Sequence, residues 1–256
     1  MQGTRAMRMT ETTPIVHADV QAMARACADR IEHLARQAQE AGHDFHLALS
    51  GGSTPAALYR ELAAPERRGH VDWDRVQVFF GDERAVPPDH ADSNFRMARE
   101  TLLDQVPLPA ANIHPIQARP DRIEADAAAY EALLRRTLPT GPDGLPRFDL
   151  VLLGTGPDGH TASLFPGTPA LEERQRLVVP VWVERLESWR ISLSYPVLDA
   201  ARHIMVLVAG SGKVDIVRAL FVTHADERRY PIQRIQPSGC VEWHLDRAAA
   251  RGLEPA

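Results

Sequence analysis

The chain has 256 residues, 44% hydrophobic and 25% charged, a balance typical of a folded globular protein rather than a disordered one. No run of about 18 uncharged apolar residues occurs, which argues against a membrane partner. The net charge is −5 without any basic block, so a nucleic-acid partner is not expected. The first residues lack the apolar core of a secretion signal, and two cysteines, Cys27 and Cys240, are too few for a disulfide framework. These features predict a cytoplasmic protein.

Along its length the chain alternates short apolar runs with amphipathic segments. Helical spacing of apolar residues begins at Val20 and ends before Gly42, which predicts a first helix. A second helix is predicted to begin with Thr54 as its N-cap and Pro55 at its first position, where the missing N–H of proline does no harm. Strands are predicted at residues 45–49, 76–80, 148–153, 177–183, 190–193, 203–209 and 241–245, and further helices at about 94–103, 122–138, 213–221 and 246–251.

No repeat or low-complexity segment interrupts this order, so we expect one domain, residues 15–252, after a flexible segment, residues 1–14. The repeated order of strand, polar turn and helix predicts an α/β fold with a mainly parallel sheet. Four glycine-rich or acidic turns each follow the carboxyl end of a predicted strand, at residues 50–55, 81–84, 154–160 and 210–213. In an open α/β sheet the ligand crevice lies at these strand ends, so the four turns are expected to converge on one pocket.

The turn from Ser50 to Thr54 has the composition of an anion-binding turn. Gly51 and Gly52 permit positive φ angles and a close approach of the backbone, and the free N–H groups of the next helix face the same space. Ser53 and Thr54 add hydroxyl donors. An ordinary strand-to-helix turn with a good cap explains the same residues equally well.

Residues 154–159 match the dinucleotide-binding pattern G-x-G-x-x-G in form. That pattern requires a long helix, yet Pro166 and Gly167 interrupt the chain, and no acidic residue ends the next predicted strand. The same turn places Asp158 two residues before His160. A histidine can take a proton from water near neutral pH and a neighbouring carboxylate can orient it, so this pair is a candidate general base. A surface or structural histidine is the alternative.

Asp82, Glu83 and Arg84 follow the second predicted strand. As site residues they offer a carboxylate for proton transfer and a guanidinium that can bind phosphate through two hydrogen bonds. The alternative is a solvated loop with a local salt bridge. Residues 92–94, Asp-Ser-Asn, are predicted to cap the helix that follows.

Lys213 is the only lysine among the 29 basic residues. It stands in Gly-Ser-Gly-Lys, between a predicted strand and a predicted helix, where it could supply a compact positive charge for a phosphate. The alternative is an exposed lysine that the helix dipole slightly disfavours. The spacing of a P-loop is absent, and so is any metal-binding spacing of histidines, cysteines or carboxylates.

Together these motifs resemble those of the 6-phosphogluconolactonases, a family in the glucosamine/galactosamine-6-phosphate isomerase superfamily. The resemblance rests on residues 50–55, on residues 81–84 with Ser93 and Asn94, and on residues 154–167, which read GTGPDGHTASLFPG. Lys213 and residues 243–249 extend it, so that it covers about residues 15–250. It implies a three-layer α/β/α fold with a Rossmann-like sheet, as in glucosamine-6-phosphate deaminases, ribose-5-phosphate isomerases and CoA transferases.

The resemblance implies hydrolysis of 6-phospho-D-glucono-1,5-lactone to 6-phosphogluconate in the pentose phosphate pathway, with no metal or other cofactor. It makes His160 the general base for a water molecule that attacks C1, with Asp158 orienting it and Asp82 as a further catalytic candidate. The implied phosphate-binding residues are Ser50, Gly51, Gly52, Ser53, Thr54, Arg84 and Lys213. The expected partner is a phosphosugar lactone, and the expected state is a monomer or a small homo-oligomer.

Two other functions fit the same fold. Glucosamine-6-phosphate deaminases have a glutamate seven residues after the aspartate, where this chain has Phe165, and typically a tyrosine in place of Arg84. Both differences favour the lactonase. A non-catalytic sugar-phosphate sensor would usually carry a DNA-binding module, and no separate basic segment is left over for one.

Overall fold

The computed structural model describes residues 12–223 and 229–254, so the predicted flexible segment lies outside the described residues up to residue 11. The strands are β1 (Ile15–His17), β2 (Phe45–Leu49), β3 (Val76–Phe80), β4 (Asp82–Arg84), β5 (Leu150–Leu153), β6 (Val178–Val183), β7 (Ser188–Leu193), β8 (His203–Val208) and β9 (Cys240–Asp246). The α-helices are α1 (Val20–Glu40), α2 (Ser53–Leu62), α3 (Asn94–Ala98), α4 (Ile123–Thr137), α5 (Tyr195–Asp199), α6 (Val214–Phe221) and α7 (Arg247–Ala250).

A six-stranded sheet in the order β1-β9-β8-β5-β2-β3 forms the centre of the molecule, and every neighbouring pair in it is parallel. Every residue of β2 and β5 is buried. A strand covered on both faces reads as a continuous apolar run rather than an alternating one, which is why these strands could be predicted from the sequence. The short edge strand β1 was not predicted.

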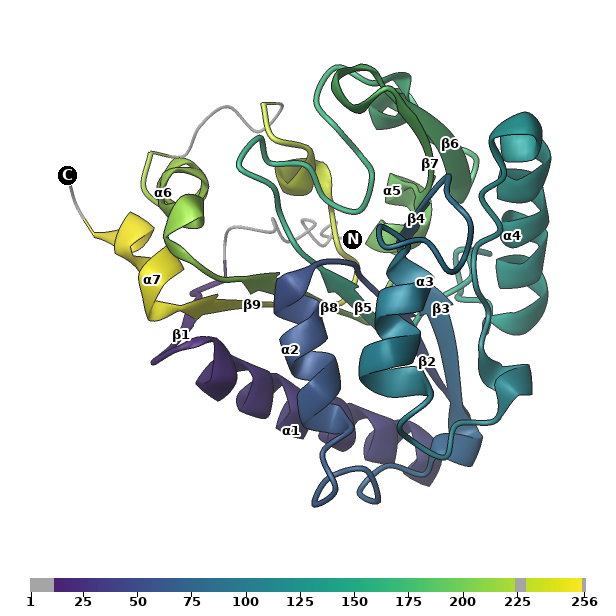
Figure 1. Cartoon of the computed structure of the whole chain (residues 1–256), viewed down its shortest axis with the longest axis horizontal. Coiled ribbons are helices and arrows are strands. Elements are labelled where there is room, and N and C mark those ends of the chain that lie inside the picture. The colour runs from purple at the N-terminus through teal and green to yellow at the C-terminus, as the bar shows by residue number, and fades with distance from the viewer. Residues whose placement is uncertain (1–11, 224–228, 255–256) are drawn as a thin grey trace, which may run out of the picture.

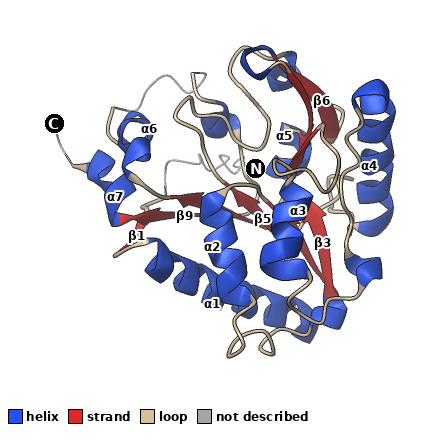
Figure 2. Cartoon of the chain, in the orientation of Figure 1, coloured by secondary structure: helices blue, strands red, loops and turns tan. Residues whose placement is uncertain are grey.

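Helices and a second sheet cover the central sheet (Figures 1 and 2). The long helix α1 lies along one face, with Asp19 as its N-cap, and buries an apolar stripe that includes Cys27 and Ile31. Helix α6 and the second sheet lie on the opposite side (Figure 1). The predicted α/β fold with a mainly parallel sheet and three layers is therefore confirmed. No helix within the described ranges is long and apolar enough to span a bilayer.

The second sheet has three antiparallel strands in the order β4-β7-β6. Its strand β4 corrects a prediction, because residues 82–84 were expected to form a turn after β3. Instead the chain leaves β3 at Gly81 and pairs at once with β7, with Asp82 opposite Ser192. Three polar residues carry little local signal for a strand, and the pairing partner lies far away in the sequence.

The start of α2 corrects a second prediction. The helix begins at Ser53 with Gly52 as its N-cap, so Thr54 is not the cap and Pro55 is the third helical residue. Gly52 has φ of 108°, a conformation that glycine tolerates and other residues rarely adopt. Pro55 is still harmless there, because the first N–H groups of a helix have no partner within it. The predicted helix 94–103 is also divided, since its second half, Arg99–Leu103, is a π-helix.

Candidate active site

The register of the central sheet brings the segments of all four predicted turns to one edge. Leu49 at the end of β2 lies beside Phe80 at the end of β3, and Leu153 of β5 pairs with Val206 of β8. Because β8, β5, β2 and β3 are consecutive neighbours, the segments that follow them lie side by side at their carboxyl ends. The segment after β3 continues as β4 along the same edge.

The turn after β5 positions His160 against Asp158. The Nδ1 atom of His160 lies 2.5 Å from Oδ1 of Asp158, and the N–H of Gly156 donates to the carbonyl of His160 at 3.0 Å. A Cβ atom at Gly156 would lie 2.2 Å from the His160 ring, so only glycine lets the side chains approach this closely. Gly159 and Ala162 have positive φ angles of 75° and 47°, which bend the segment back. Nδ1–H of the neutral ring donates a hydrogen bond to the carboxylate, so Nε2 can accept a proton.

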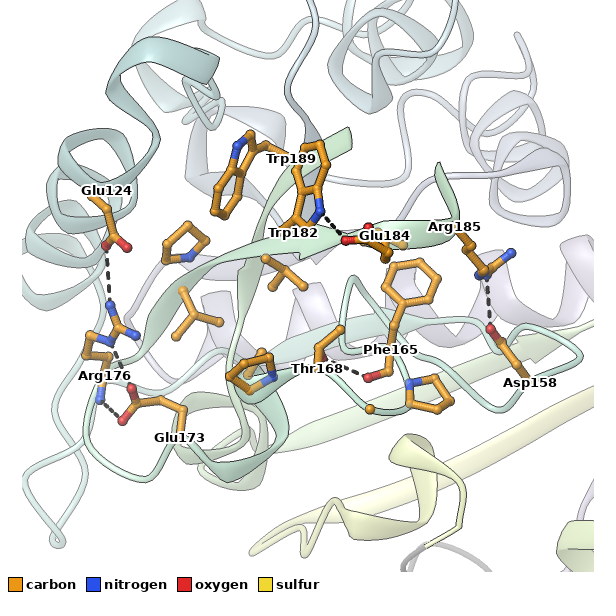
Figure 3. A pocket seen from close by; sticks show the side chains of 18 residues that line it. Glu124, Asp158, Phe165, Thr168, Glu173, Arg176, Trp182, Glu184, Arg185 and Trp189 are labelled. Carbon is orange, nitrogen blue, oxygen red and sulfur yellow. Dashed lines mark hydrogen bonds and ion pairs between the residues drawn. The ribbon is translucent and has the colours of Figure 1, made fainter. Parts of the chain in front are cut away.

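Phe165 and Arg185 form a group of four side chains with the Asp158–His160 pair. Figure 3 shows three of them, Asp158, Phe165 and Arg185. The Phe165 ring stacks on His160 with centroids 4.2 Å apart. The guanidinium of Arg185 lies over the same phenyl ring at 5.1 Å and donates to Oδ2 of Asp158 at 3.0 Å. Phe165 therefore holds the imidazole in place, and it stands where a glucosamine-6-phosphate deaminase has a glutamate.

The environment keeps His160 neutral and Asp158 ionised. Burial lowers the pKa of His160, and this effect outweighs the opposite influence of Asp158. Burial by itself would raise the pKa of Asp158, but the hydrogen bonds from His160 and the charge of Arg185 contribute to lowering it. A neutral imidazole beside an ionised carboxylate is the state that a general base requires near neutral pH.

Asp82 is held firmly within the same edge. Its carboxylate accepts from the Ser163 hydroxyl at 2.6 Å and from the Asn94 amide at 3.2 Å, and only 7% of the residue is exposed. The charge of Asp82 acts on His160, whose pKa it tends to raise. Asp82 therefore joins the His160 turn to the start of α3.

Glu83 points to the opposite face of β4. Its carboxylate accepts from the backbone N–H groups of Arg84, Asn94 and Phe95, each at 2.8 Å, and from the Ser93 hydroxyl at 3.0 Å. Burial raises the pKa of Glu83 against the effect of these donors. Ser93 is the N-cap of α3, as predicted, and its hydroxyl accepts from the N–H of Arg96. The Glu83 carboxylate is thus bonded to groups of the protein and has a structural role rather than a role in ligand binding.

The turn from Ser50 to Thr54 packs against Asn94 and contains a buried hydroxyl group without a partner among the described residues. A Cβ atom at Gly51 would lie 1.9 Å from Oδ1 of Asn94, so glycine lets the turn press against the residue that holds Asp82. The Ser50 hydroxyl is buried and has no hydrogen-bond partner among the described residues. A buried hydroxyl without a partner is unfavourable, and here it stands just before the N-terminus of α2, where N–H groups are free.

Lys213 lies between β8 and α6, as predicted. Its Nζ donates to the carbonyl of Thr155 at 2.7 Å, which brings its charge to the turn of Asp158 and His160. Burial lowers the pKa of Lys213. This half-buried position differs from the exposed lysine of the alternative interpretation.

Arg84 lies at the end of β4, directly opposite Arg190 of β7. Its Nη1 donates to the carbonyl of Asp92 at 2.5 Å, while its buried Nε has no partner within the described part of the chain. The local salt bridge of the alternative interpretation does not form between Arg84 and Glu83, because the only group of Arg84 that donates to the Glu83 carboxylate is its backbone N–H.

A pocket of about 740 Å³ lies beside the four-residue group, against β6 and β7 (Figure 3). Asp158, Phe165 and Arg185 line one part of it, and Trp182 and Trp189 line another. None of the predicted phosphate-binding residues lines it. Within the described ranges no three histidine, cysteine or acidic side chains are grouped so that they could hold a metal ion.

Contacts join most of the predicted site residues, directly or through one neighbour. The His160–Asp158 pair contacts Lys213 through Thr155, and Asp82 contacts the glycine turn through Asn94. No hydrogen bond between described residues joins Lys213 to Arg84. Ser163, Arg185 and Arg190 were not predicted as site residues, because the residues beside them in the fold lie far away in the chain. The alternation of Arg190 and Ser192 along a predicted strand is the one signal that could have suggested a shared face.

Comparison with known proteins identifies the family. A model described as glucosamine-6-phosphate isomerases/6-phosphogluconolactonase matches residues 18–243. The chain belongs to this family. It is 44% identical to the 6-phosphogluconolactonase of Synechocystis sp. over 210 residues, which cover 82% of this chain and 85% of that protein. The predicted resemblance is thus confirmed.

Solved structures have the same fold. The crystal structure of 6-phosphogluconolactonase from Leishmania guyanensis matches with a TM-score of 0.81 and 31% identity, covering 95% of this chain and 100% of that chain. A monomeric glucosamine-6-phosphate deaminase matches with a TM-score of 0.77 and 19% identity, covering 93% of this chain and 99% of that chain. The second likeness concerns the fold alone, so the distinction between the two activities depends on the site residues.

Proposed function

We propose that the protein hydrolyses 6-phospho-D-glucono-1,5-lactone to 6-phosphogluconate, in the oxidative part of the pentose phosphate pathway. The observation that carries the proposal is the Asp158–His160 pair, 2.5 Å apart, with the Phe165 ring stacked on the imidazole. This arrangement supplies one general base, His160. It has a phenyl ring at the position where a glucosamine-6-phosphate deaminase has a glutamate. The similarity to relatives named 6-phosphogluconolactonase supports the same reaction.

His160 activates the attacking water molecule. Nε2 takes a proton from water as its oxygen bonds to C1, and Asp158 holds the other ring nitrogen. When the bond between C1 and the ring oxygen breaks, the imidazolium returns that proton to the ring oxygen, which becomes a hydroxyl group. The new carboxylic acid then releases its proton to solvent. The reaction consumes one water molecule and leaves His160 neutral.

The phosphate is bound away from the reacting carbon. The Ser50 hydroxyl and the first N–H groups of α2 supply donors, and Lys213 and Arg84 supply positive charge. Binding a remote phosphate fixes the lactone relative to His160 and so contributes to catalysis without touching the ester. Asp82 acts through Ser163 and Asn94, which position the His160 turn and the glycine turn.

NMR spectra of freshly prepared lactone, recorded with and without the protein, test the proposal. We expect hydrolysis well above the spontaneous rate, with 6-phosphogluconate as the product. Ammonia release from glucosamine 6-phosphate at a comparable rate would favour the deaminase instead. Binding of both sugar phosphates without turnover would favour a sensor.

The two unpaired cysteines, Cys27 and Cys240, are in keeping with a reducing cytoplasm.

A further inference from the structure

Arg190 shares a face of the small sheet with two predicted site residues. The register of β4 and β7 places Arg190 opposite Arg84 and Ser192 opposite Asp82. Cross-strand partners, and residues two apart along a strand, project from the same face of a sheet. The side chains of Asp82, Arg84, Arg190 and Ser192 therefore share one face, which is the face in contact with the His160 turn through Ser163.

The charges of Asp82, Glu83 and Asp92 act on Arg190, but none of these carboxylates forms an ion pair with it among the described residues. The Arg190 side chain has no ion pair or hydrogen bond among the described residues, and its Nε is buried. Burial, and then the charge of Arg84, lower the pKa of Arg190. Like charges directly opposite each other destabilise a sheet, so this pair is unfavourable without a counter-ion.

The nearby carboxylates are committed to other donors. Asp82 accepts from Ser163 and Asn94. Glu83, on the opposite face, accepts from three backbone N–H groups and a hydroxyl. Arg84 and Arg190 therefore stand opposite each other at the edge where the substrate is expected, and the buried Nε atom of each has no partner in the described part of the chain. A doubly charged anion is the ligand that would satisfy both.

We propose that Arg190 is a phosphate-binding residue, and that it binds the 6-phosphate of the substrate together with Arg84. The inference rests on the proposed function, since that function supplies the phosphate. The carbonyl oxygen of Asp92 fixes one end of Arg84, and Arg190 adds a second guanidinium beside it. A phosphate dianion matches the charge of the pair better than the single charge that develops at C1 or the carboxylate of the product.

Calorimetry tests the proposal. It measures the affinity of Arg190→Gln and Arg190→Lys for inorganic phosphate, 6-phosphogluconate and gluconate. Arg147→Gln is the matched control, because Arg147 also has a buried, unpartnered Nε but pairs with Asp143 before β5, at the other end of the sheet. Thermal unfolding of each variant without phosphate gives the effect on stability. KM and kcat for the phosphorylated lactone complete the set.

We expect Arg190→Gln to weaken binding of phosphate and of 6-phosphogluconate about ten- to a hundredfold, the range for one charged hydrogen-bonded group. KM should rise with kcat nearly unchanged, Arg190→Lys should be intermediate, and Arg147→Gln should match wild type. Without phosphate, Arg190→Gln should unfold at the wild-type temperature or above it, because a like-charge contact is removed.

Phosphate affinity of Arg190→Gln within twofold of wild type would overturn the inference. An equal loss of affinity for gluconate, which has no phosphate, would also overturn it, because Arg190 would then bind the carboxylate of the sugar acid. A third result would also overturn it. If Arg190→Lys binds phosphate as weakly as Arg190→Gln, and both variants unfold at a lower temperature than wild type, then the role of Arg190 is structural. If the wild-type protein does not hydrolyse the lactone, the proposed function fails, yet the titration with inorganic phosphate still decides the role of Arg190.

Discussion

Arg185 donates a hydrogen bond to Asp158 across 3.0 Å, from the turn between β6 and β7. The other oxygen of the same carboxylate holds His160, so the exposed arginine acts on the imidazole through one residue. Its charge lowers the pKa of both Asp158 and His160. Arg185 is therefore a positioning residue for the general base.

Arg185→Gln should raise the pKa of His160, because a positive charge near the imidazole is removed. His160 acts as a base only when neutral, so the acid limb of the profile of kcat/KM against pH should move to higher pH. At neutral pH the loss should be at most about fivefold, as for an exposed ion pair. Arg185→Lys should restore the wild-type profile. An unchanged acid limb in Arg185→Gln would show that the charge of Arg185 does not reach His160.

His160→Ala should lower kcat by roughly two to four orders of magnitude, the usual contribution of a general base. Binding of 6-phosphogluconate should remain near wild type, because the phosphate-binding residues are unchanged. Stopped-flow hydrolysis and calorimetry measure the two effects separately. Turnover close to that of wild type would exclude His160 as the base.

Gly51→Ala should impair both stability and activity. The new methyl group would lie 1.9 Å from Oδ1 of Asn94 and would displace the amide that binds Asp82. Overpacking of this kind costs about 1–3 kcal/mol of unfolding free energy. Gly69→Ala is the matched control, because nothing lies within 4 Å of a Cβ atom there. Equal unfolding free energies for the two variants would contradict the close packing of Gly51 against Asn94.

Lys213→Gln should raise KM about tenfold or more, since it removes a charged donor from the proposed phosphate site. A phosphate-binding group serves the ground state and the transition state alike, so kcat should change less. Unphosphorylated gluconolactone is the control substrate, and its slow hydrolysis should barely respond. An equal fractional loss on both lactones would assign Lys213 to the fold or to the chemistry.

The stability of the β1 edge should fall in acid. His17 of β1 contacts His244 of β9 at 3.0 Å, and burial, followed by the charge of His244, lowers the pKa of His17 below its ordinary value of 6.5. The unfolded chain then binds the proton more readily, so the unfolding free energy declines as pH falls below about 6.5. His17→Gln should reduce this decline between about pH 7 and pH 5, whereas replacing the exposed His33 should not. Parallel curves for both variants would be evidence against the His17–His244 contact.

Local patterns in the sequence were sufficient for most of the central sheet and for the core of the site. The strands β2, β5 and β8 are nearly continuous apolar runs, because helices and a second sheet cover them. Asp158 and His160 lie two residues apart, so their contact depends on a single turn whose glycines are visible in the sequence. The start of α2 was misplaced by two positions because Gly52, rather than the hydroxyl side chain of Thr54, caps the helix.

The tertiary structure alone decided which side chains surround those motifs. Asp82 and Arg84 form a strand only because β7 pairs with them, and the same pairing places Arg190 beside Arg84. Arg185 reaches Asp158 because the β6–β7 hairpin folds back over the turn after β5. A short polar segment has no strong preference of its own, so contacts between residues far apart in the chain determine its conformation. The sequence by itself therefore determined the motifs and their order along the sheet, whereas the charge balance around the general base and the phosphate site depends on how distant strands pair.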